Sequence, residues 1–260
     1  MKRIGYSFLF TALAATTAFA TPVPNSAVLH ERVFNDCPAS TLVSTNAFPA
    51  LVEFNDSDPV PSCFGFANLH TWRFSTDGVN AIQFQNGDAF QYGATLTLNG
   101  YGEGGLSLAP WWSPEADGLF NVRSTDGEIA VFGGRLPFYS FTGSQGLTYV
   151  NNTPIHLEII YNPRSLSAAL PAQVTYNIVY GANNYTSGPL SFDQGNPAED
   201  PPHGQYGALN PWYAGGHVKM FLFDNLPSHA MDATWTNITY NSDPTPATPK
   251  SWGKIKAEYR

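Results

Sequence analysis

The chain has 260 residues, of which 12 are Lys or Arg and 20 are Asp or Glu, so its formal net charge at neutral pH is −8. An acidic surface repels nucleic acid, and no basic patch with interleaved aromatic residues offsets it, which excludes nucleic-acid binding. Charged residues make up only 12% of the chain and aromatic residues 14%, with 23 Gly and 21 Pro. This composition is typical of short strands separated by turns.

The N-terminus has the pattern of a secretory signal peptide over residues 1–20. Lys2 and Arg3 precede an apolar stretch, and the run that ends at Ala20 consists of small residues. This order predicts cleavage near Ala20 and a secreted mature chain, which is extracellular, at the cell surface or periplasmic. A membrane anchor is the alternative, but the apolar stretch is shorter than the roughly 20 residues that span a bilayer, and no later segment is apolar enough to span.

The next segment, residues 21–64, is a Pro- and Asn-rich lead-in that we expect to pack on the main domain, with one strand over residues 50–54. It contains the two cysteines of the chain, Cys37 and Cys63. In an oxidising compartment an even count favours a disulfide, which would contribute about 3 kcal/mol by restricting the unfolded chain. The alternatives are two free thiols or a metal pair, and two sulfurs alone make no zinc site.

Residues 65–241 show the alternation of apolar and polar residues that is typical of half-buried antiparallel strands. Gly, Asp-Gly and Gly-Gly pairs separate the segments, and no window has a convincing helical period. The pattern predicts an all-β antiparallel sandwich with few or no helices. The expected strands cover residues 72–74, 80–85, 94–98, 119–123, 129–132, 155–159, 173–180, 185–187, 217–223 and 233–240. Residues 181–184 are expected to form the turn of a hairpin.

The C-terminal segment, residues 242–260, differs from the domain. A Pro/Thr linker leads into a tail that holds four basic residues: Lys250, Lys254, Lys256 and Arg260. Such a linker is expected to be extended. The tail is either a frayed terminus or a docking or sorting tag, and it loosely resembles the short Trp-Gly-x-Ile-Lys tails of exported bacterial proteins.

Secreted sandwiches of this size often act on polysaccharides, either by hydrolysis or by elimination, and the two reactions need different residues. A glycosidase needs two facing carboxylates, and nothing in the sequence brings any two glutamates together. A polysaccharide lyase instead needs a Tyr or His to move a proton beside a uronic carboxylate, and an Arg, Asn or Gln to neutralise that carboxylate. The catalytic candidates for a lyase are Arg123, Arg135, His217 and Tyr206, with structural hydrogen bonding as the alternative role for each.

Consecutive aromatic residues give the stronger hint of ligand binding. Trp111 and Trp112 form one pair, and Phe138 and Tyr139 form another. A strand turns only one residue of such a pair inward, so we expect at least one ring of each to be exposed and able to stack on a sugar face. The alternative is that these rings cap the open end of the sandwich.

The sequence predicts no metal site and no cofactor, with a structural calcium ion as the alternative. Asp56 and Asp58, and the pair Glu199 and Asp200, offer carboxylate oxygens of the kind that calcium binds. Neither group has the spacing of a defined calcium loop.

Two segments carry a resemblance to a known superfamily. Residues 155–192, with the strand from Leu157 to Tyr161 and the hairpin from Tyr176 to Ser187, resemble the central strands of concanavalin A-like proteins, and residues 233–240 resemble the closing strand. That superfamily includes laminin-G modules, lectins, and jelly-roll glucanases and lyases. The resemblance implies a jelly-roll sandwich and a glycan partner, but no catalytic signature accompanies it, and fold does not fix function.

Three functions therefore stay open at this point. The first is a secreted carbohydrate-binding or surface-associated module, and the second is a polysaccharide lyase or glycoside hydrolase on the same scaffold. The third is a structural or interaction protein without a glycan ligand. The sequence leaves open whether the chain is an enzyme, and it defines neither the glycan nor the oligomeric state.

Overall fold

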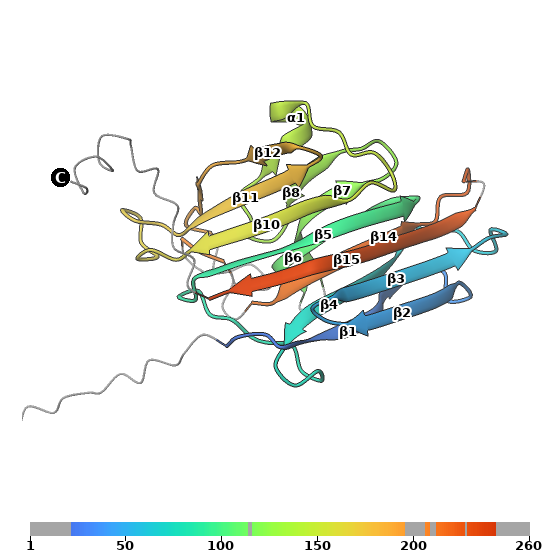
Figure 1. The fold of residues 1–260 in the computed structure, drawn as a ribbon, viewed down its shortest axis with the longest axis horizontal. Helices are drawn as coiled ribbons and strands as arrows, with labels where there is room; N and C mark the ends of the chain where they lie inside the picture. The colour runs from blue at the N-terminus through green and yellow to red at the C-terminus, as the bar shows by residue number, and fades with distance from the viewer. Residues whose placement is uncertain (1–21, 114–115, 196–205, 209–211, 227, 243–260) are drawn as a thin grey trace, which may run out of the picture.

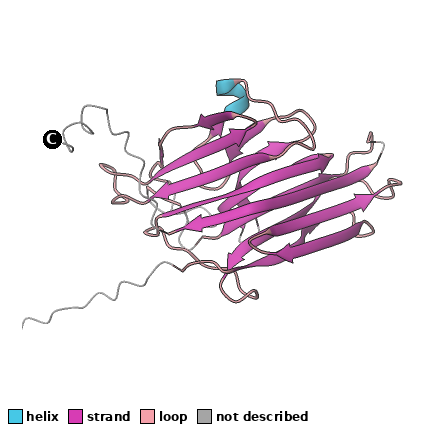
Figure 2. Ribbon diagram, in the orientation of Figure 1, coloured by secondary structure: helices cyan, strands magenta, loops and turns pink. Residues whose placement is uncertain are grey.

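The computed structural model describes residues 22–113, 116–195, 206–208, 212–226 and 228–242, with only the backbone described over residues 109–113 and 116–117. Two antiparallel sheets lie face to face (Figures 1 and 2). The seven-stranded sheet has, in spatial order, β1 (Ser26–Asn35), β4 (Ala67–Ser75), β14 (Ala214–Phe221), β6 (Gly102–Ser113), β7 (Ala116–Arg123), β8 (Ile129–Phe132) and β9 (Tyr139–Ser140).

The second sheet has, in order, β12 (Asn183–Thr186), β11 (Gln173–Tyr180), β10 (Ile155–Asn162), β5 (Phe90–Gly100), β15 (His229–Asn241), β3 (Leu51–Asp58) and β2 (Thr41–Ala47), with β13 (Leu190–Ser191) paired to β11. The chain crosses repeatedly between the sheets. This two-sheet arrangement confirms the predicted all-β antiparallel sandwich. The helix in the described part of the chain, α1 (Phe141–Gln145), is five residues long, as the absence of a helical period predicted.

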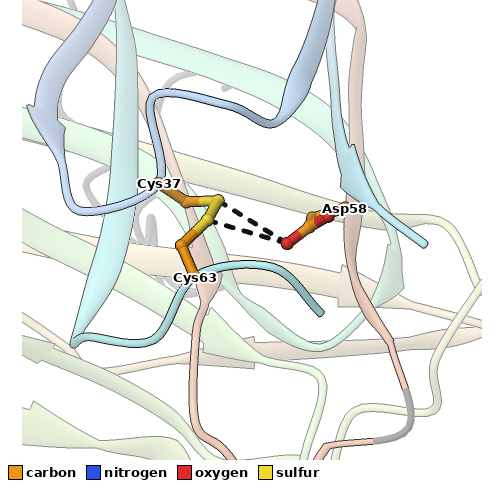
Figure 3. Close-up of side chains that lie close together, drawn as sticks. All are labelled: Cys37, Asp58 and Cys63. Atoms are coloured by element: carbon orange, nitrogen blue, oxygen red, sulfur yellow. Dashed lines mark hydrogen bonds between the residues drawn. A yellow bond between two sulfur atoms is a disulfide. The ribbon is translucent and has the colours of Figure 1, made fainter. Parts of the chain in front are cut away.

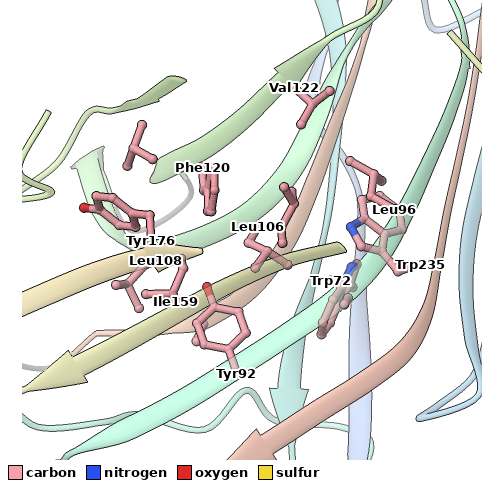
Figure 4. Packing of buried hydrophobic residues seen from close by; sticks show 14 of the residues in the cluster. Trp72, Tyr92, Leu96, Leu106, Leu108, Phe120, Val122, Ile159, Tyr176 and Trp235 are labelled. Carbon is pink, nitrogen blue, oxygen red and sulfur yellow. The ribbon is translucent and has the colours of Figure 1, made fainter. Parts of the chain in front are cut away.

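The core lies between the sheets and is built from alternate residues of each strand. On β10, Ile155, Leu157 and Ile159 are fully buried while His156 and Glu158 point to the outer face, as the alternation predicted. Large rings fill the centre of the sandwich (Figure 4), and the fully buried ones include Trp72, Tyr92, Phe120, Tyr176 and Trp235. Each such side chain stabilises the fold by about 1.5–3 kcal/mol through removal of apolar surface from water.

The lead-in contributes more to the sandwich than the single strand expected over residues 50–54. That strand is β3, and two more strands, β1 and β2, belong to the same segment. β1 pairs with β4 in one sheet and β2 pairs with β3 in the other. β1 and β2 were not predicted because their apolar runs are short. Both strands lie at sheet edges, where much of each strand faces solvent.

Two other expectations about strands are wrong. Residues 80–85 form no strand, because only Ala81 and Phe84 make isolated bridges, and the Phe84 ring turns inward to stack on Trp212 at 4.6 Å. The turn of the β11–β12 hairpin is also tighter than expected, since Tyr180 pairs directly with Asn183. In addition, β6 lies in a Gly-rich run that the alternation did not identify as a strand.

A buried polar cluster closes one end of the core. Asp56 points inward from β3 and is 1% exposed. Its Oδ2 atom lies 3.0 Å from His70 Nε2 and accepts a hydrogen bond from Asn68 Nδ2 at 2.8 Å. Burial raises the pKa of Asp56, but the hydrogen bonds from His70, Ser40 and Asn68 outweigh it and leave the pKa below its ordinary value. Asp56 is thus a structural anion with protein donors around it.

Candidate functional site

The seven-stranded sheet has an apolar face toward the core and a polar face on its other side. Side chains alternate along a strand, so the residues between the buried core positions share the outer face. The strand register places them in rows of cross-strand partners. The central row runs His30, Thr71, His217, Gly105 and Asn121, and the row beside it runs Val28, Arg73, Gly215, Ser107 and Leu119.

His217 lies at the centre of this face, and its orientation is fixed by two neighbours. Its Nε2 atom is 3.0 Å from Asn121 Oδ1, and Asn121 Nδ2 donates to Glu103 Oε2 at 2.8 Å. Because the Asn121 amide nitrogen is committed to a carboxylate, its oxygen faces the histidine and accepts the Nε2–H proton. A neutral His217 therefore carries its lone pair on Nδ1.

The environment of His217 keeps the imidazole neutral. The side chain is fully buried, and burial together with the positive charge of Lys219 holds its pKa well below the ordinary value, although a contact with the backbone of Leu106 acts in the opposite direction. Its Nδ1 atom makes no hydrogen bond within the described part of the chain, and the same holds for the buried hydroxyls of Thr71 and Ser107. Buried polar atoms normally find partners, so water or a bound ligand would complete the hydrogen bonding of these three groups.

Gly105 separates His217 from Asn121 in the central row, and no larger residue fits there. A Cβ atom at this position would collide with the carbonyl oxygen of Phe120 and would lie 3.3 Å from His217 Cε1. The glycine permits the close approach of β6 and β7, and it leaves the floor of the face beside His217 without a side chain.

The row on the other side of His217 is an ion-pair network. Glu103 accepts from Lys219 Nζ at 2.8 Å and lies 3.8 Å from Arg123 Nε, while Arg123 also pairs with Asp126 at 2.8 Å and with Glu128. The network holds the carboxylate that orients Asn121. Arg123 thus shares the face with His217, although its charge is committed to three carboxylates.

Aromatic rings lie at both ends of the face. Arg73 stacks over the partly exposed ring of Tyr213 at 4.5 Å, and Gln83 Nε2 donates to the Tyr213 hydroxyl at 3.0 Å. Beyond Lys219, Phe221 packs against the exposed rings of Phe223 at 5.1 Å and Phe66 at 6.5 Å. Rings in such positions are suited to stack on sugars.

The other two catalytic candidates lie elsewhere. Arg135 donates to the Asp193 carbonyl at 3.0 Å and pairs with the Asp193 carboxylate, so it ties together two loops. Tyr206 has a left-handed backbone with φ of 52°, and its carbonyl oxygen accepts from Ala172 at 2.8 Å. Neither makes a described contact with the His217 row, so the register groups only His217 and Arg123 of the four.

The predicted aromatic binding pairs differ in what the structure describes. Trp111 and Trp112 are in β6, and their side chains lie outside the described residues. Phe138 is 70% exposed, whereas Tyr139 packs on Phe141 at 4.9 Å and its hydroxyl accepts from Gln145 at 2.7 Å. A glycan-binding role for these four residues stays a prediction.

Side chains that could bind a metal ion come together at one place in the described part of the chain. Glu199 and Asp200 lie outside it, and Asp56 and Asp58 point into separate clusters, so no calcium arrangement forms among the described residues. One group of three ligating side chains occurs there: Cys37, Asp58 and Cys63 (Figure 3). Cys37 and Cys63 form the predicted disulfide, with their Cα atoms 5.5 Å apart.

Most residues of the polar face were not predicted from the sequence. His217 and Arg123 were named, but Asn121, Thr71 and Ser107 were not, because Asn, Thr and Ser in strands carry no catalytic signature. A usable signal was present in β4, where Leu69, Thr71 and Arg73 alternate with the core residues. That alternation marks the outer face, and only the strand order reveals its neighbours.

No protein-family model matches the chain, and no curated protein sequence matches it. Structurally similar proteins include the alginate lyase from Klebsiella pneumoniae (TM-score 0.46, 8% identity, 77% of this chain and 84% of that one) and the alginate lyase from Alteromonas sp.272 (0.43, 10%, 85% and 95%). A family 7 alginate lyase, A1-II', is similar with a TM-score of 0.43 and 7% sequence identity, over 75% of this chain and 80% of that one. These values carry no argument about activity. No helix in the described segments is long and apolar enough to cross a membrane.

Proposed function

We propose that this protein is a polysaccharide lyase for a uronate-containing glycan, with its site on the outer face of the seven-stranded sheet. The observation that carries the proposal is His217, a buried neutral imidazole whose Nε2–H is held by Asn121 and whose Nδ1 lone pair is open. A lyase needs such a proton acceptor, since a base with a lowered pKa is unprotonated at neutral pH.

The reaction would proceed by β-elimination. His217 Nδ1 removes the proton α to the uronate carboxylate, the electron pair forms a carbon–carbon double bond, and the glycosidic C–O bond at the neighbouring carbon breaks. The leaving oxygen takes up a proton. Thr71 and Ser107, whose hydroxyls border His217 in the rows, are placed to donate hydrogen bonds to the carboxylate as negative charge develops on it.

The carboxylates of the face favour elimination over hydrolysis. Glu103 is saturated by Lys219, Asn121 and Arg123, and the nearby Asp126 and Glu128 are paired with Arg123. A hydrolase needs one carboxylic acid and one free carboxylate across the scissile bond. The described face offers no such pair. His217 has no exposed surface, so a glycan can reach it only when the side chains around it move.

A test is ultraviolet detection of the unsaturated product on a panel of alginate, pectate and a neutral glucan. The wild type should give product from a polyuronate and none from the glucan. His217→Asn should lower the rate at least about 100-fold, as expected for loss of a general base. His156→Asn is the matched control, because His156 lies on the outer face of the other sheet, where it contacts Thr95 at 3.2 Å, and it should keep full activity. An active and folded His217→Asn protein would refute the role of His217.

Non-catalytic glycan binding is the second candidate, and the exposed rings of Phe66 and Phe223 favour it. Affinity electrophoresis on the same glycans separates the two functions. Retardation of the wild type without any unsaturated product, lost in Phe66→Ala and Phe223→Ala, would establish binding and overturn the lyase proposal.

A further inference from the structure

The disulfide lies against a carboxylate that points at both of its sulfurs (Figure 3). Asp58 Oδ2 is 3.7 Å from Cys37 Sγ and 3.6 Å from Cys63 Sγ. Disulfide sulfurs carry no proton and donate nothing to this oxygen. Its donors are Ser62, whose backbone N–H lies at 2.7 Å and whose hydroxyl lies at 3.0 Å.

A histidine from the neighbouring strand lies beside the carboxylate of this group. His229 is the cross-strand partner of Asp58, and its side chain is fully buried. Its Nε2 atom lies 3.2 Å from the carbonyl oxygen of Phe223, which can only accept, so Nε2 carries the proton. The other ring nitrogen, Nδ1, points at Asp58 Oδ2 from 3.6 Å and makes no hydrogen bond.

Two electron-pair donors therefore face each other in a buried site when His229 is neutral. Such an arrangement is stable only if a proton or a cation lies between them. The two sulfurs lie beside the same oxygen of Asp58, at 3.7 and 3.6 Å. Two sulfurs, one carboxylate oxygen and one imidazole nitrogen are four ligands of the types that zinc binds tetrahedrally, provided that the sulfurs are thiolates.

We propose that, when Cys37 and Cys63 are reduced, their thiolates bind a zinc-type divalent cation together with Asp58 and His229. A dithiol reductant supplies two electrons and two protons to the S–S bond and is itself oxidised to a disulfide, so that the bond breaks to give two thiols, and the cation then displaces both thiol protons. The disulfide and the metal are thus alternative cross-links between the same segments. The two sulfurs that alone make no zinc site gain the missing ligands from β3 and β15.

The location of the ligands supports this alternative. Cys37 lies two residues after the end of β1, Cys63 is in the loop between β3 and β4, and Asp58 and His229 pair across two adjacent strands. The strand pair keeps the oxygen and the nitrogen in place without the disulfide. Cys63 is partly exposed, which gives a reductant and a cation a route to the site.

Cobalt(II) titration of the reduced protein, followed by absorption spectroscopy, tests the proposal. The reduced wild type should show thiolate-to-cobalt charge transfer and the intense visible bands of a tetrahedral site, and zinc should bleach both. The oxidised protein should show neither. His229→Asn and Asp58→Asn should bind zinc at least about tenfold more weakly, while the remote control His156→Asn should match the wild type.

Three outcomes would overturn the proposal. The first is a folded, reduced wild type without charge transfer, and the second is unchanged affinity in both His229→Asn and Asp58→Asn, which would mean that the cysteines bind metal by themselves. The third concerns a reduced protein that has unfolded. Zinc should then restore its circular dichroism spectrum, and failure to do so contradicts the site. Circular dichroism of the oxidised variants establishes that each substitution leaves the fold intact.

Discussion

Replacement of Asp56 by Ala should be among the most damaging polar substitutions in this domain. The change leaves one buried donor, His70 Nε2–H, without its acceptor, whereas Asn68 Nδ2 keeps Cys37 O at 3.2 Å and Ser40 Oγ at 3.0 Å. His70 cannot respond by moving its proton, because its Nδ1 atom accepts the backbone N–H of Arg32 at 3.0 Å. An unsatisfied buried donor costs about 1–3 kcal/mol, so we expect a loss of about 1–3 kcal/mol in the free energy of unfolding.

Urea denaturation of the oxidised protein measures this loss. Glu53→Ala is the matched control, since Glu53 lies on the same strand but points to the other face, and its substitution should change the free energy of unfolding by less than about 0.5 kcal/mol. A cycle of Asp56→Ala, His70→Ala and the double variant should give a coupling of more than about 1 kcal/mol. A loss below about 1 kcal/mol in Asp56→Ala would refute the assigned role of the cluster.

Three further predictions concern pH and cross-linking. Because the pKa of folded Asp56 lies below its ordinary value of 3.8, its stabilisation is complete above that pH and is lost as the pH falls through the folded pKa, so the urea midpoint of Asp56→Asn should fall less in acid than that of the wild type. The lowered pKa of His217 has the same effect at a higher pH, so stability should decline as the pH drops below the ordinary value of 6.5. His217→Asn should reduce this slope, to which the lowered pKa values of His30 and His156 also contribute. Replacement of Cys37 and Cys63 by Ser opens a loop of 26 residues and should cost about 3.5 kcal/mol in the urea assay. An unchanged midpoint in the double Ser variant would show that the lead-in is held by its strands alone.

Local patterns were sufficient to predict the strands that have one buried face and one exposed face. β10 and β11 alternate without interruption, so their inward residues could be identified from the sequence. β6 could not, because its Gly-rich run has few side chains to alternate. The neighbouring strands approach so closely at Gly105 that a side chain does not fit there. This requirement comes from the tertiary structure and cannot be read from a short stretch of sequence.

The candidate site was less accessible to sequence reasoning than the fold. His217 and Asn121 are 96 residues apart and meet only because β6 lies between β14 and β7. The scarcity of basic residues drew attention to Arg123 and Arg135 alike, yet one lies on the polar face and the other ties two loops together. Residue types indicated the chemistry, but the strand order determines which of these residues lie close enough to act together.

The ring nitrogens of the histidines separate structural from reactive roles more sharply than burial does. His70, His217 and His229 are all buried, and each has one nitrogen fixed by a neighbour. In His70 both nitrogens are hydrogen-bonded, which leaves no lone pair and makes the residue a connector within the core. In His217 and His229 the Nδ1 atom is open, in one case toward the polar face and in the other toward Asp58 and the disulfide. A neutral imidazole with one committed nitrogen is an oriented base or ligand, so these two residues, and not His70, are where chemistry is expected.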